Sequence, residues 1–177
     1  MKPSLFSIPN FMSQGECAAQ IAETEQRGFG PAPITTGFGF RMVPEVRNNT
    51  RVMVDDPALA ERLWLRLRER TELENSGGWQ PIGLNERFRY YRYDVGQAFR
   101  WHHDGAFIRN ASEQSLLTFM VYLNEDFAGG ATEFEQTHVV PRVGDALIFR
   151  HGLRHQGAEV TRGTKYVLRS DVMFRRG

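Results

Sequence analysis

Two residues near the middle of the chain, His102 and Asp104, have the side chains and the spacing of a metal-binding pair. They lie in an aromatic, alternating segment, residues 98–104, whose pattern favours a β-strand. Successive side chains of a strand point to opposite faces, so His102 and Asp104 are expected to share a face while His103 turns away. An imidazole and a carboxylate on one face supply two of the three ligands of an open metal site.

The third ligand is expected from a different strand, and His155 is the candidate. Two histidines and one carboxylate on one side of an octahedron leave the other positions open, as non-haem Fe(II) needs when it binds O2 and a second molecule together. Zinc would prefer a closed tetrahedron. His151 and His155 are also spaced like a helical zinc pair, but Gly152 and the β-like flanks argue against a helix, and no Glu follows His151.

A family resemblance rests on these residues and on blocks that follow them. The segment from Tyr93 to Asp104 fits the pattern Tyr-x-x-Gly-x-x-Phe-x-x-His-x-Asp and resembles the 2-oxoglutarate and Fe(II)-dependent oxygenases, in particular their prolyl 4-hydroxylase-like branch. The resemblance covers residues 87 to 174, about half of the chain. The further matches, in order, are Thr118 with Tyr122-Leu123-Asn124, Gly129-Gly130-Ala131-Thr132-Glu133-Phe134, Pro141 with Gly144-Asp145-Ala146-Leu147-Ile148-Phe149, His155, and Lys165 ten residues beyond it.

The resemblance implies a role for each matched residue. The metal ligands, which are also the catalytic residues, would be His102, Asp104 and His155. Tyr93 would hydrogen-bond the cosubstrate, and Thr118 would add a hydroxyl contact or serve only as a strand residue. The cosubstrate is a dianion, so its distal carboxylate needs a fixed cation inside the barrel. Lys165 matches the family position for that cation, whereas Arg169 with Ser170 resembles the Arg-x-Ser element of related oxygenases, so either residue would be the anchor.

The implied reaction is the hydroxylation of a C–H bond in a peptidyl or small-molecule substrate, with release of succinate and CO2. Its cofactors would be Fe(II), 2-oxoglutarate as cosubstrate and O2, with ascorbate left open. Halogenation is disfavoured because halogenating relatives carry Ala or Gly in place of the carboxylate of Asp104. The alternative is a non-catalytic or sensor cupin-like metal-binding module. His103, His138 and His151 are expected to be structural or to lie next to the ligands.

Composition narrows the class of protein. The 177 residues suit one domain, 1–177, with helical and loop support over 1–82 and a β-core over 83–177. A formal net charge of +1 gives no strong field toward nucleic acid, and no apolar run is long enough for a membrane span.

The single cysteine, Cys17, cannot form an internal disulfide, and the N-terminus lacks the apolar run of a signal peptide, so the expected compartment is the cytoplasm. Nothing in the sequence indicates an oligomeric state.

Two helices are predicted before the β-core. The first covers residues 13–27, with Ser13 as N-cap, Glu16 completing a capping box and Gly28 ending the run. The second runs from Asp56 as N-cap, with Pro57 at the first helical position, to about residue 70. Residues 28–51, rich in Gly and Pro with short β-like pieces, would form a mobile loop over the site. The apolar positions of the first helix are Cys17, Ala18, Ile21 and Ala22.

The β-core is predicted from short alternating runs separated by turns. These runs indicate a mainly β fold with flanking N-terminal helices, a double-stranded β-helix of the jelly-roll, cupin-like kind. The expected strands are 86–94, 98–104, 116–124, 131–135, 138–140, 145–150, 155–160 and 164–174. Cationic and aromatic side chains would lie near the mouth of the site or on solvated strand faces, namely Arg87, Arg89, Arg92, Trp101 and Arg109.

Overall fold

The two predicted helices are present in the structure, a computed structural model that describes residues 4–36 and 38–177. Helix α1 (Gln14–Arg27) begins after Ser13, whose hydroxyl accepts from the Glu16 backbone N–H while the Glu16 carboxylate accepts from that of Ser13. Helix α2 (Pro57–Arg70) begins after Asp56, which accepts from a backbone N–H in the first turn. Both helix starts were predicted because capping is a local interaction. Neither helix of the described chain has the length and apolarity that crossing a membrane requires.

The buried face of α1 differs from the predicted one. Cys17 and Thr24 are buried, and Ile21 between them is half-buried, whereas Ala18 and Ala22 are exposed. Positions 17, 21 and 24 repeat at helical spacing and form one narrow stripe against the sheet. The prediction included the two alanines because it counted apolar residues rather than locating the centre of the stripe.

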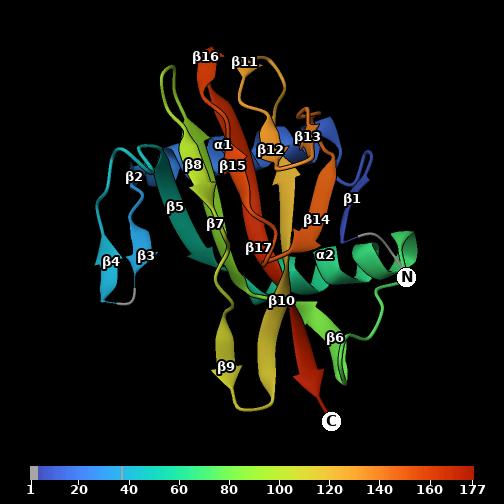
Figure 1. Ribbon diagram of the computed structural model, residues 1–177. Helices are drawn as coiled ribbons and strands as arrows, with labels where there is room; N and C mark the ends of the chain where they lie inside the picture. The colour runs from blue at the N-terminus through green and yellow to red at the C-terminus, as the bar shows by residue number, and fades with distance from the viewer. Residues whose placement is uncertain (1–3, 37) are drawn as a thin grey trace.

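A large antiparallel sheet forms the centre of the molecule (Figure 1). Within the described residues its strand order is β1-β14-β10-β17-β7-β5-β2, with β6 paired to β17 and β9 paired to β10. The bounds are β1 Leu5–Ile8, β14 Ala146–Arg150, β10 Glu113–Tyr122, β17 Lys165–Arg176, β7 Arg87–Tyr93, β5 Thr50–Asp55, β2 Gly30–Pro31, β6 Trp79–Leu84 and β9 Ile108–Asn110.

A smaller sheet, of order β13-β12-β15-β8, faces the large one, as Figure 1 shows, and completes a double-stranded β-helix. Its presence confirms the predicted fold class. Its strands are β13 Thr137–Val139, β12 Thr132–Phe134, β15 His155–Gly157 and β8 Phe99–His102. Two further pairs stand apart, β11 Ala128–Gly129 with β16 Val160–Arg162, and the hairpin β3 Ile34–Thr36 with β4 Gly39–Arg41.

The N-terminal half contributes more than the helical and loop support predicted for residues 1–82. Strand β1 pairs with β14, and β5 pairs with β7 along its whole length, so both belong to the large sheet. Strand β6, which pairs with the distant β17, was also not predicted, and a single sequence does not show which distant segments pair. The short strand β9, which pairs with the neighbouring β10, was missed as well. The segment 28–51, predicted as a loop with short β-like pieces, contains the short strands β2, β3 and β4 and the start of β5, and its residue Gly37 lies outside the described residues.

The large sheet buries a different set of side chains on each face. Phe88, Phe119 and Leu168 point toward the helices, where they pack with the buried face of α2. Their neighbours along the strands, such as Met120 and Val167, point toward the smaller sheet and form a second core. This alternation follows from the two-residue period of a strand. The helix side is closed by packing, so the site can lie only between the two sheets.

Replacement of Leu67 by Ala tests the packing of α2 on the sheet. Leu67 is fully buried in the helix-side core. Leu67→Ala should lower the free energy of unfolding by about 2–5 kcal/mol, because the lost methyl groups leave a cavity. Urea unfolding followed by circular dichroism measures the change. The control is Leu65→Ala on the exposed side of the same helix, which should change stability by only about 0.5 kcal/mol. Equal losses in the two variants would contradict the described packing.

Candidate active site

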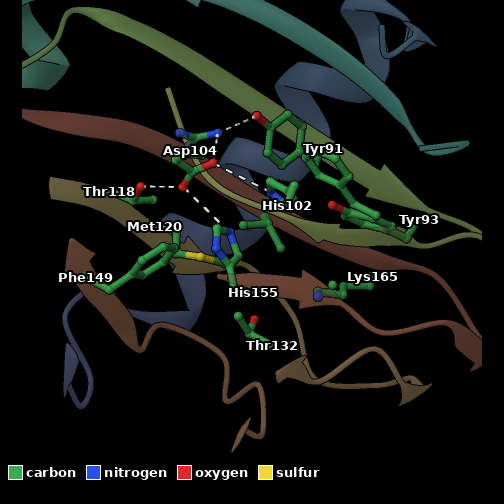
Figure 2. Close-up of a pocket in the computed structure, with 14 residues that line it drawn as sticks. Tyr91, Tyr93, His102, Asp104, Thr118, Met120, Thr132, Phe149, His155 and Lys165 are labelled. Atoms are coloured by element: carbon green, nitrogen blue, oxygen red, sulfur yellow. Dashed lines mark hydrogen bonds and ion pairs between the residues drawn. The ribbon is translucent and has the colours of Figure 1, made fainter. Parts of the chain in front are cut away.

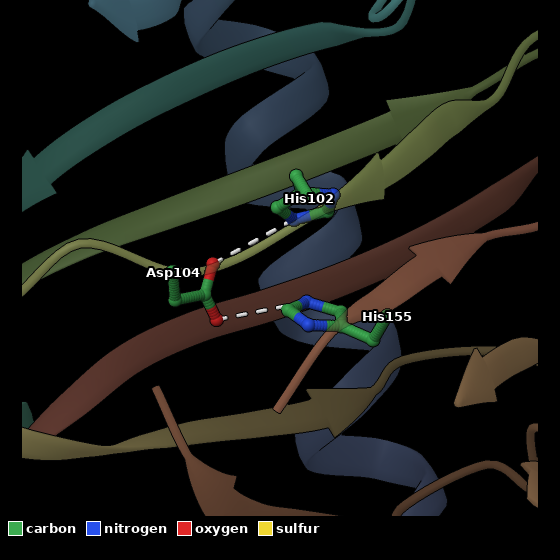
Figure 3. A group of neighbouring side chains, drawn as sticks. All are labelled: His102, Asp104 and His155. Carbon is green, nitrogen blue, oxygen red and sulfur yellow. Dashed lines mark ion pairs between the residues drawn. The ribbon is translucent and has the colours of Figure 1, made fainter. Parts of the chain in front are cut away.

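His102 and His155 oppose each other directly across the pair of strands β8 and β15. Asp104 follows two residues after His102 and turns its carboxylate between the two imidazoles, as Figure 3 shows. The closest atoms are His102 Nε2 to Asp104 Oδ1, 3.7 Å, and His155 Nε2 to Asp104 Oδ2, 3.6 Å. One ligand atom from each residue lies within 4.8 Å of the others. The three residues singled out by spacing therefore meet at one point.

Asp104 reaches this point by a different route from the one predicted. Strand β8 ends at His102, so Asp104 lies in the segment that follows rather than on the same regular strand. Its backbone N–H donates to the carbonyl oxygen of His151, which fixes the turn of the chain. His103 is exposed, as expected for the residue between the pair.

Each imidazole is oriented by a hydrogen bond to the backbone carbonyl group two residues before it in the chain. His102 Nδ1 lies 2.7 Å from the carbonyl oxygen of Arg100, and His155 Nδ1 lies 2.9 Å from that of Leu153. A carbonyl oxygen can only accept, so each Nδ1 carries the hydrogen and each Nε2 keeps a free lone pair. Both lone pairs face Asp104, and metal-binding histidines are commonly oriented in this way.

The protonation states also suit a metal site. Burial lowers the pKa of His155 to about 4, despite the attraction of the nearby Asp104 carboxylate, so its imidazole is neutral at pH 7. Burial raises the pKa of Asp104, but the Arg169 guanidinium beside it outweighs burial and holds the pKa well below its usual range. A metal ion requires a neutral imidazole and an ionised carboxylate, and this site supplies both without first losing protons.

A chain of hydrogen bonds runs behind Asp104 and involves His151, which was expected to be structural or to lie next to the ligands. Thr118 Oγ1 lies 2.5 Å from Asp104 Oδ2 and 3.0 Å from His151 Nδ1, and Ser115 Oγ lies 2.9 Å from His151 Nε2. The Ser115 oxygen also accepts from the Phe107 backbone N–H, 2.8 Å away. Because Thr118 has one hydrogen and donates it to the carboxylate, it accepts from His151, which accepts in turn from Ser115. Burial lowers the pKa of His151, in agreement with this neutral tautomer.

Lys165 is a buried cation at the opposite end of the pocket from Asp104 (Figure 2). Its side chain is almost entirely buried, and Nζ donates to the carbonyl oxygen of Gly130, 2.7 Å away. No carboxylate pairs with it among the described residues, and burial lowers its pKa to about 7. A buried amine with donors to spare is costly unless an anion joins it.

Arg169 lies in the same pocket but already has acidic partners. Its Nη1 is 3.0 Å from Asp104 Oδ1 and its Nη2 is 3.3 Å from Asp171 Oδ1. It shares the strand face of Lys165, as the spacing of four residues predicted, because both side chains of β17 line the pocket. Lys165 and Arg169 therefore differ in electrostatics: the lysine is uncompensated, whereas the arginine neutralises carboxylates.

Besides the predicted Tyr93, the pocket contains side chains that sequence reasoning did not select, among them Tyr91. Tyr91 and Tyr93 both line it from β7, and Thr132 lies near Lys165 in Figure 2. The Tyr122 hydroxyl lies 2.7 Å from Thr132 Oγ1, and its ring centroid is 5.8 Å from Lys165 Nζ. Tyr93, predicted to contact the cosubstrate, has its ring centroid 5.0 Å from the same nitrogen. Strand alternation from Tyr93 would have found Tyr91.

The other residues singled out from the sequence lie away from the ligands. His138 is exposed on β13, Arg92 pairs with Glu25 and Asp94, and Arg109 pairs with Glu86 and Glu113. Trp101 is half-exposed beneath the guanidinium of Arg154. Arg87 and Arg89, by contrast, line a cavity beside the metal ligands.

A double-stranded β-helix with two histidines and one carboxylate at an open pocket defines a class of mononuclear metal-dependent oxygenases. Residues 88–170 match the family model of the 2OG-Fe(II) oxygenase superfamily. This β-core, a little under half of the chain, is therefore similar to that superfamily, and the match together with the His-Asp-His group supports Fe(II) and 2-oxoglutarate as cofactors. The residues fit both groups, since the His-Asp-His donor set suits Fe(II) and the unpaired Lys165 suits a dianion. No curated protein matches the sequence.

Solved structures share the fold over nearly the whole chain. A viral collagen prolyl hydroxylase from Paramecium bursaria Chlorella virus-1, in complex with 2OG, is 20% identical, with a TM-score of 0.67 over 98% of this chain and 97% of that one. A Pseudomonas putida prolyl-4-hydroxylase is 17% identical, with a TM-score of 0.70 over 98% and 93%. An oxidoreductase of the 2OG-Fe(II) oxygenase family from Burkholderia pseudomallei is 14% identical, with a TM-score of 0.59 over 98% and 86%. At these identities the likeness shows a common fold.

Substitution of His155 tests the metal site directly. His155→Ala should weaken Mn(II) binding by more than about a hundred-fold, because loss of groups that merely support a ligand already costs about 10–100-fold. The measurement is a titration followed by the electron paramagnetic resonance signal of free Mn(II). His103→Ala is the matched control, since His103 is exposed and adjacent to the pair. Unchanged affinity in His155→Ala would show that the metal binds elsewhere.

Proposed function

We propose that this protein hydroxylates a C–H bond of a peptidyl or small-molecule substrate, using Fe(II) held by His102, Asp104 and His155. The balanced reaction takes substrate, O2 and 2-oxoglutarate to hydroxylated substrate, succinate and CO2. The observation that carries the proposal is one pocket containing both the convergent triad and an uncompensated buried lysine. The prolyl hydroxylases among the structural neighbours favour a peptidyl substrate. A cytoplasmic location stays a proposal, supported by a single cysteine that is buried.

When bound, Fe(II) and 2-oxoglutarate supply the oxidation of the C–H bond, and the protein supplies binding, orientation and a dry pocket. His102 and His155 present their Nε2 lone pairs, and the backbone carbonyls behind them keep the rings from turning. Thr118 holds one oxygen of Asp104 by a hydrogen bond, and Arg169 holds the other by an ion pair. The carboxylate is thereby fixed before any ligand arrives, which reduces the reorganisation that binding requires.

The distal carboxylate of 2-oxoglutarate is assigned to Lys165. Its ammonium group has one partner, the Gly130 carbonyl oxygen, so further donors can serve an anion. Gly130 has φ +66, and a Cβ at this position would lie 3.1 Å from the lysine side chain. Glycine therefore leaves the space that the lysine side chain occupies. Arg169 is a poorer anchor because a new carboxylate would compete with Asp104 and Asp171 for its guanidinium. Tyr93 is assigned to the cosubstrate from its place beside Lys165.

Succinate release with Lys165→Met and Arg169→Gln tests both the reaction and the anchor. Wild-type protein should form succinate from 2-oxoglutarate only with Fe(II) and O2, and mass spectrometry should find one added oxygen atom in the substrate. Lys165→Met should raise the KM for 2-oxoglutarate by roughly 10–100-fold, the value of a hydrogen bond to a charged group. Arg169→Gln should mainly lower kcat. The reverse pattern would exchange the two roles, and wild-type protein without 2-oxoglutarate turnover would rule out the function.

Proton uptake gives an independent test of Lys165. With a pKa of about 7 in the free protein, the amine is mostly neutral above that pH. A carboxylate beside it favours the charged form and raises the pKa, so binding 2-oxoglutarate to the Mn(II)-loaded protein near pH 8 should take up about one proton. The uptake should vanish below about pH 6, where the lysine is already charged. Calorimetry in buffers of different ionisation enthalpy measures it.

Lys165→Met supplies the control for this measurement. Residual binding by the variant should involve no proton uptake, because the titrating amine is gone. Equal uptake by variant and wild type would assign the proton to another group and would remove the support that Lys165 gives to the proposed function.

A further inference from the structure

A cavity of about 530 Å³ opens beside the metal ligands and gives access to them. It shares Tyr91, Phe99, His102, Asp104 and Arg169 with the pocket that contains the triad. Lys165 does not line it. A molecule in this cavity would therefore contact the triad from the side away from the cosubstrate cation. We call it the arginine cleft, because five arginines line it, namely Arg47, Arg51, Arg87, Arg89 and Arg169.

The charges of the arginine cleft do not balance. Asp104 is the one carboxylate among its described lining residues. Arg169 is paired with Asp104 and Asp171, Arg89 shares Asp171, and Arg87 is paired with Asp55. Within residues 4–36 and 38–177, Arg47 and Arg51 have no carboxylate within ion-pair distance. Bound Fe(II) and a 2-oxoglutarate dianion cancel each other, so the surplus positive charge would persist in the loaded enzyme.

Arg47 is built into the wall of the cleft. It is only 4% exposed, and its guanidinium carbon lies 4.3 Å from the ring centroid of Phe99 and 4.5 Å from that of Tyr91. Nε donates to Asn49 Oδ1 at 2.8 Å, and Nη1 donates to the Pro33 carbonyl oxygen at 3.5 Å. Nη2 is buried and has no hydrogen-bond partner among the residues that the structure describes. A buried guanidinium donor without an acceptor is costly, and its retention points to a ligand that completes it.

Arg47 is also close to the chemistry. Phe99, which packs against its guanidinium, stacks on the imidazole of His102 with ring centroids 3.5 Å apart. The ring of Phe99 lies between Arg47 and His102, so a group bound at Arg47 would be separated from the candidate ligand His102 by that ring. Arg51, half-buried next to it, has its pKa lowered by burial and by the neighbouring charges of Arg47 and Arg89. The two unpaired arginines therefore act on the same region of the cleft.

We propose that the arginine cleft binds the substrate through a carboxylate, which Arg47 and Arg51 hold while a nearby C–H bond faces the triad. This inference rests on the proposed function and names its substrate class: a molecule with an acidic group close to the carbon that is oxidised. Planar guanidinium groups match a carboxylate in shape and charge. The carboxylate belongs to a free amino acid or to an acidic residue beside the target in a peptide.

Binding without turnover tests the proposal and separates the two sources. The protein is saturated with Mn(II) and 2-oxoglutarate, and calorimetry measures three sets of probes. The first set is the common free L-amino acids, each compared with its amide. The second is the peptide acetyl-Gly-Glu-Pro-Glu-Gly-amide, compared with its Gln counterpart. The third is inorganic phosphate.

An acid should bind about 10-fold or more tightly than its amide, in the free or in the peptide set, because its charged carboxylate forms ion pairs with the guanidinium groups through two oxygens, whereas the amide offers one neutral acceptor. The preference should disappear in Arg47→Gln and shrink in Arg51→Gln, and Arg47→Lys should restore part of it by keeping the charge. The control Arg62→Gln removes an exposed arginine on α2 and should leave the preference intact. Circular dichroism confirms that each variant is folded.

The proposal is overturned if no acid exceeds its amide, if the preference survives in both Arg47→Gln and Arg51→Gln, or if phosphate binds more tightly than every acid. Failure here is distinguishable from failure of the proposed function. Wild-type protein that binds Mn(II) and 2-oxoglutarate but shows no preference for acids contradicts only the arginine cleft. Wild-type protein that binds neither contradicts the function itself.

Discussion

The site depends on the antiparallel pairing of β8 with β15, which sets His102 opposite His155. Each imidazole belongs to a short strand of the smaller sheet, and the pairing places the two ring centroids 4.3 Å apart. The pairing is supported from behind, where Phe99 stacks on His102 and Phe149 packs edge-on against His155. Asp104 needs only the next turn of chain to join them. A shift of register by one residue would turn one histidine to the opposite face and destroy the site.

Electrostatics then divides the pocket into regions with separate tasks. At one end Asp104 is held between Thr118 and Arg169, so its charge and direction are fixed. At the other end Lys165 has no acidic partner among the described residues, so it can pair with the carboxylate of a bound ligand. The arginine cleft adds a third region in which Arg47 is confined by aromatic rings. Burial strengthens the interactions of each of these charges, because water cannot compensate a cation in the interior of a barrel.

Much of this arrangement was predictable because its signals are local or strongly patterned. Capping residues gave both helices, strand alternation gave most of the β-core, and the spacing from His102 to Asp104 gave two ligands. The remainder depends on distant partners. The pairing of β5 with β7 leaves no mark in either sequence segment. Contacts between side chains from distant segments could not be predicted from the sequence either.

Contacts between distant side chains decide the roles of Arg47, His151 and Arg169. Arg47 lies in a segment that reads only as a polar loop, and its aromatic neighbours come from two other strands. His151 has the same residue type as the ligands, but it gains its role from Thr118 and Ser115. The choice between Lys165 and Arg169 as anchor required knowing which cation already had a carboxylate.

The central claim is that one pocket holds Fe(II) at the triad and 2-oxoglutarate against the same metal. The most direct test is anaerobic addition of Fe(II) and then 2-oxoglutarate to the protein, followed by visible absorption spectroscopy. Chelation of the keto acid by the metal produces a charge-transfer band, which we expect in the wild type and in His103→Ala but not in His155→Ala. Absence of the band in wild-type protein that has bound both Fe(II) and 2-oxoglutarate would contradict the account.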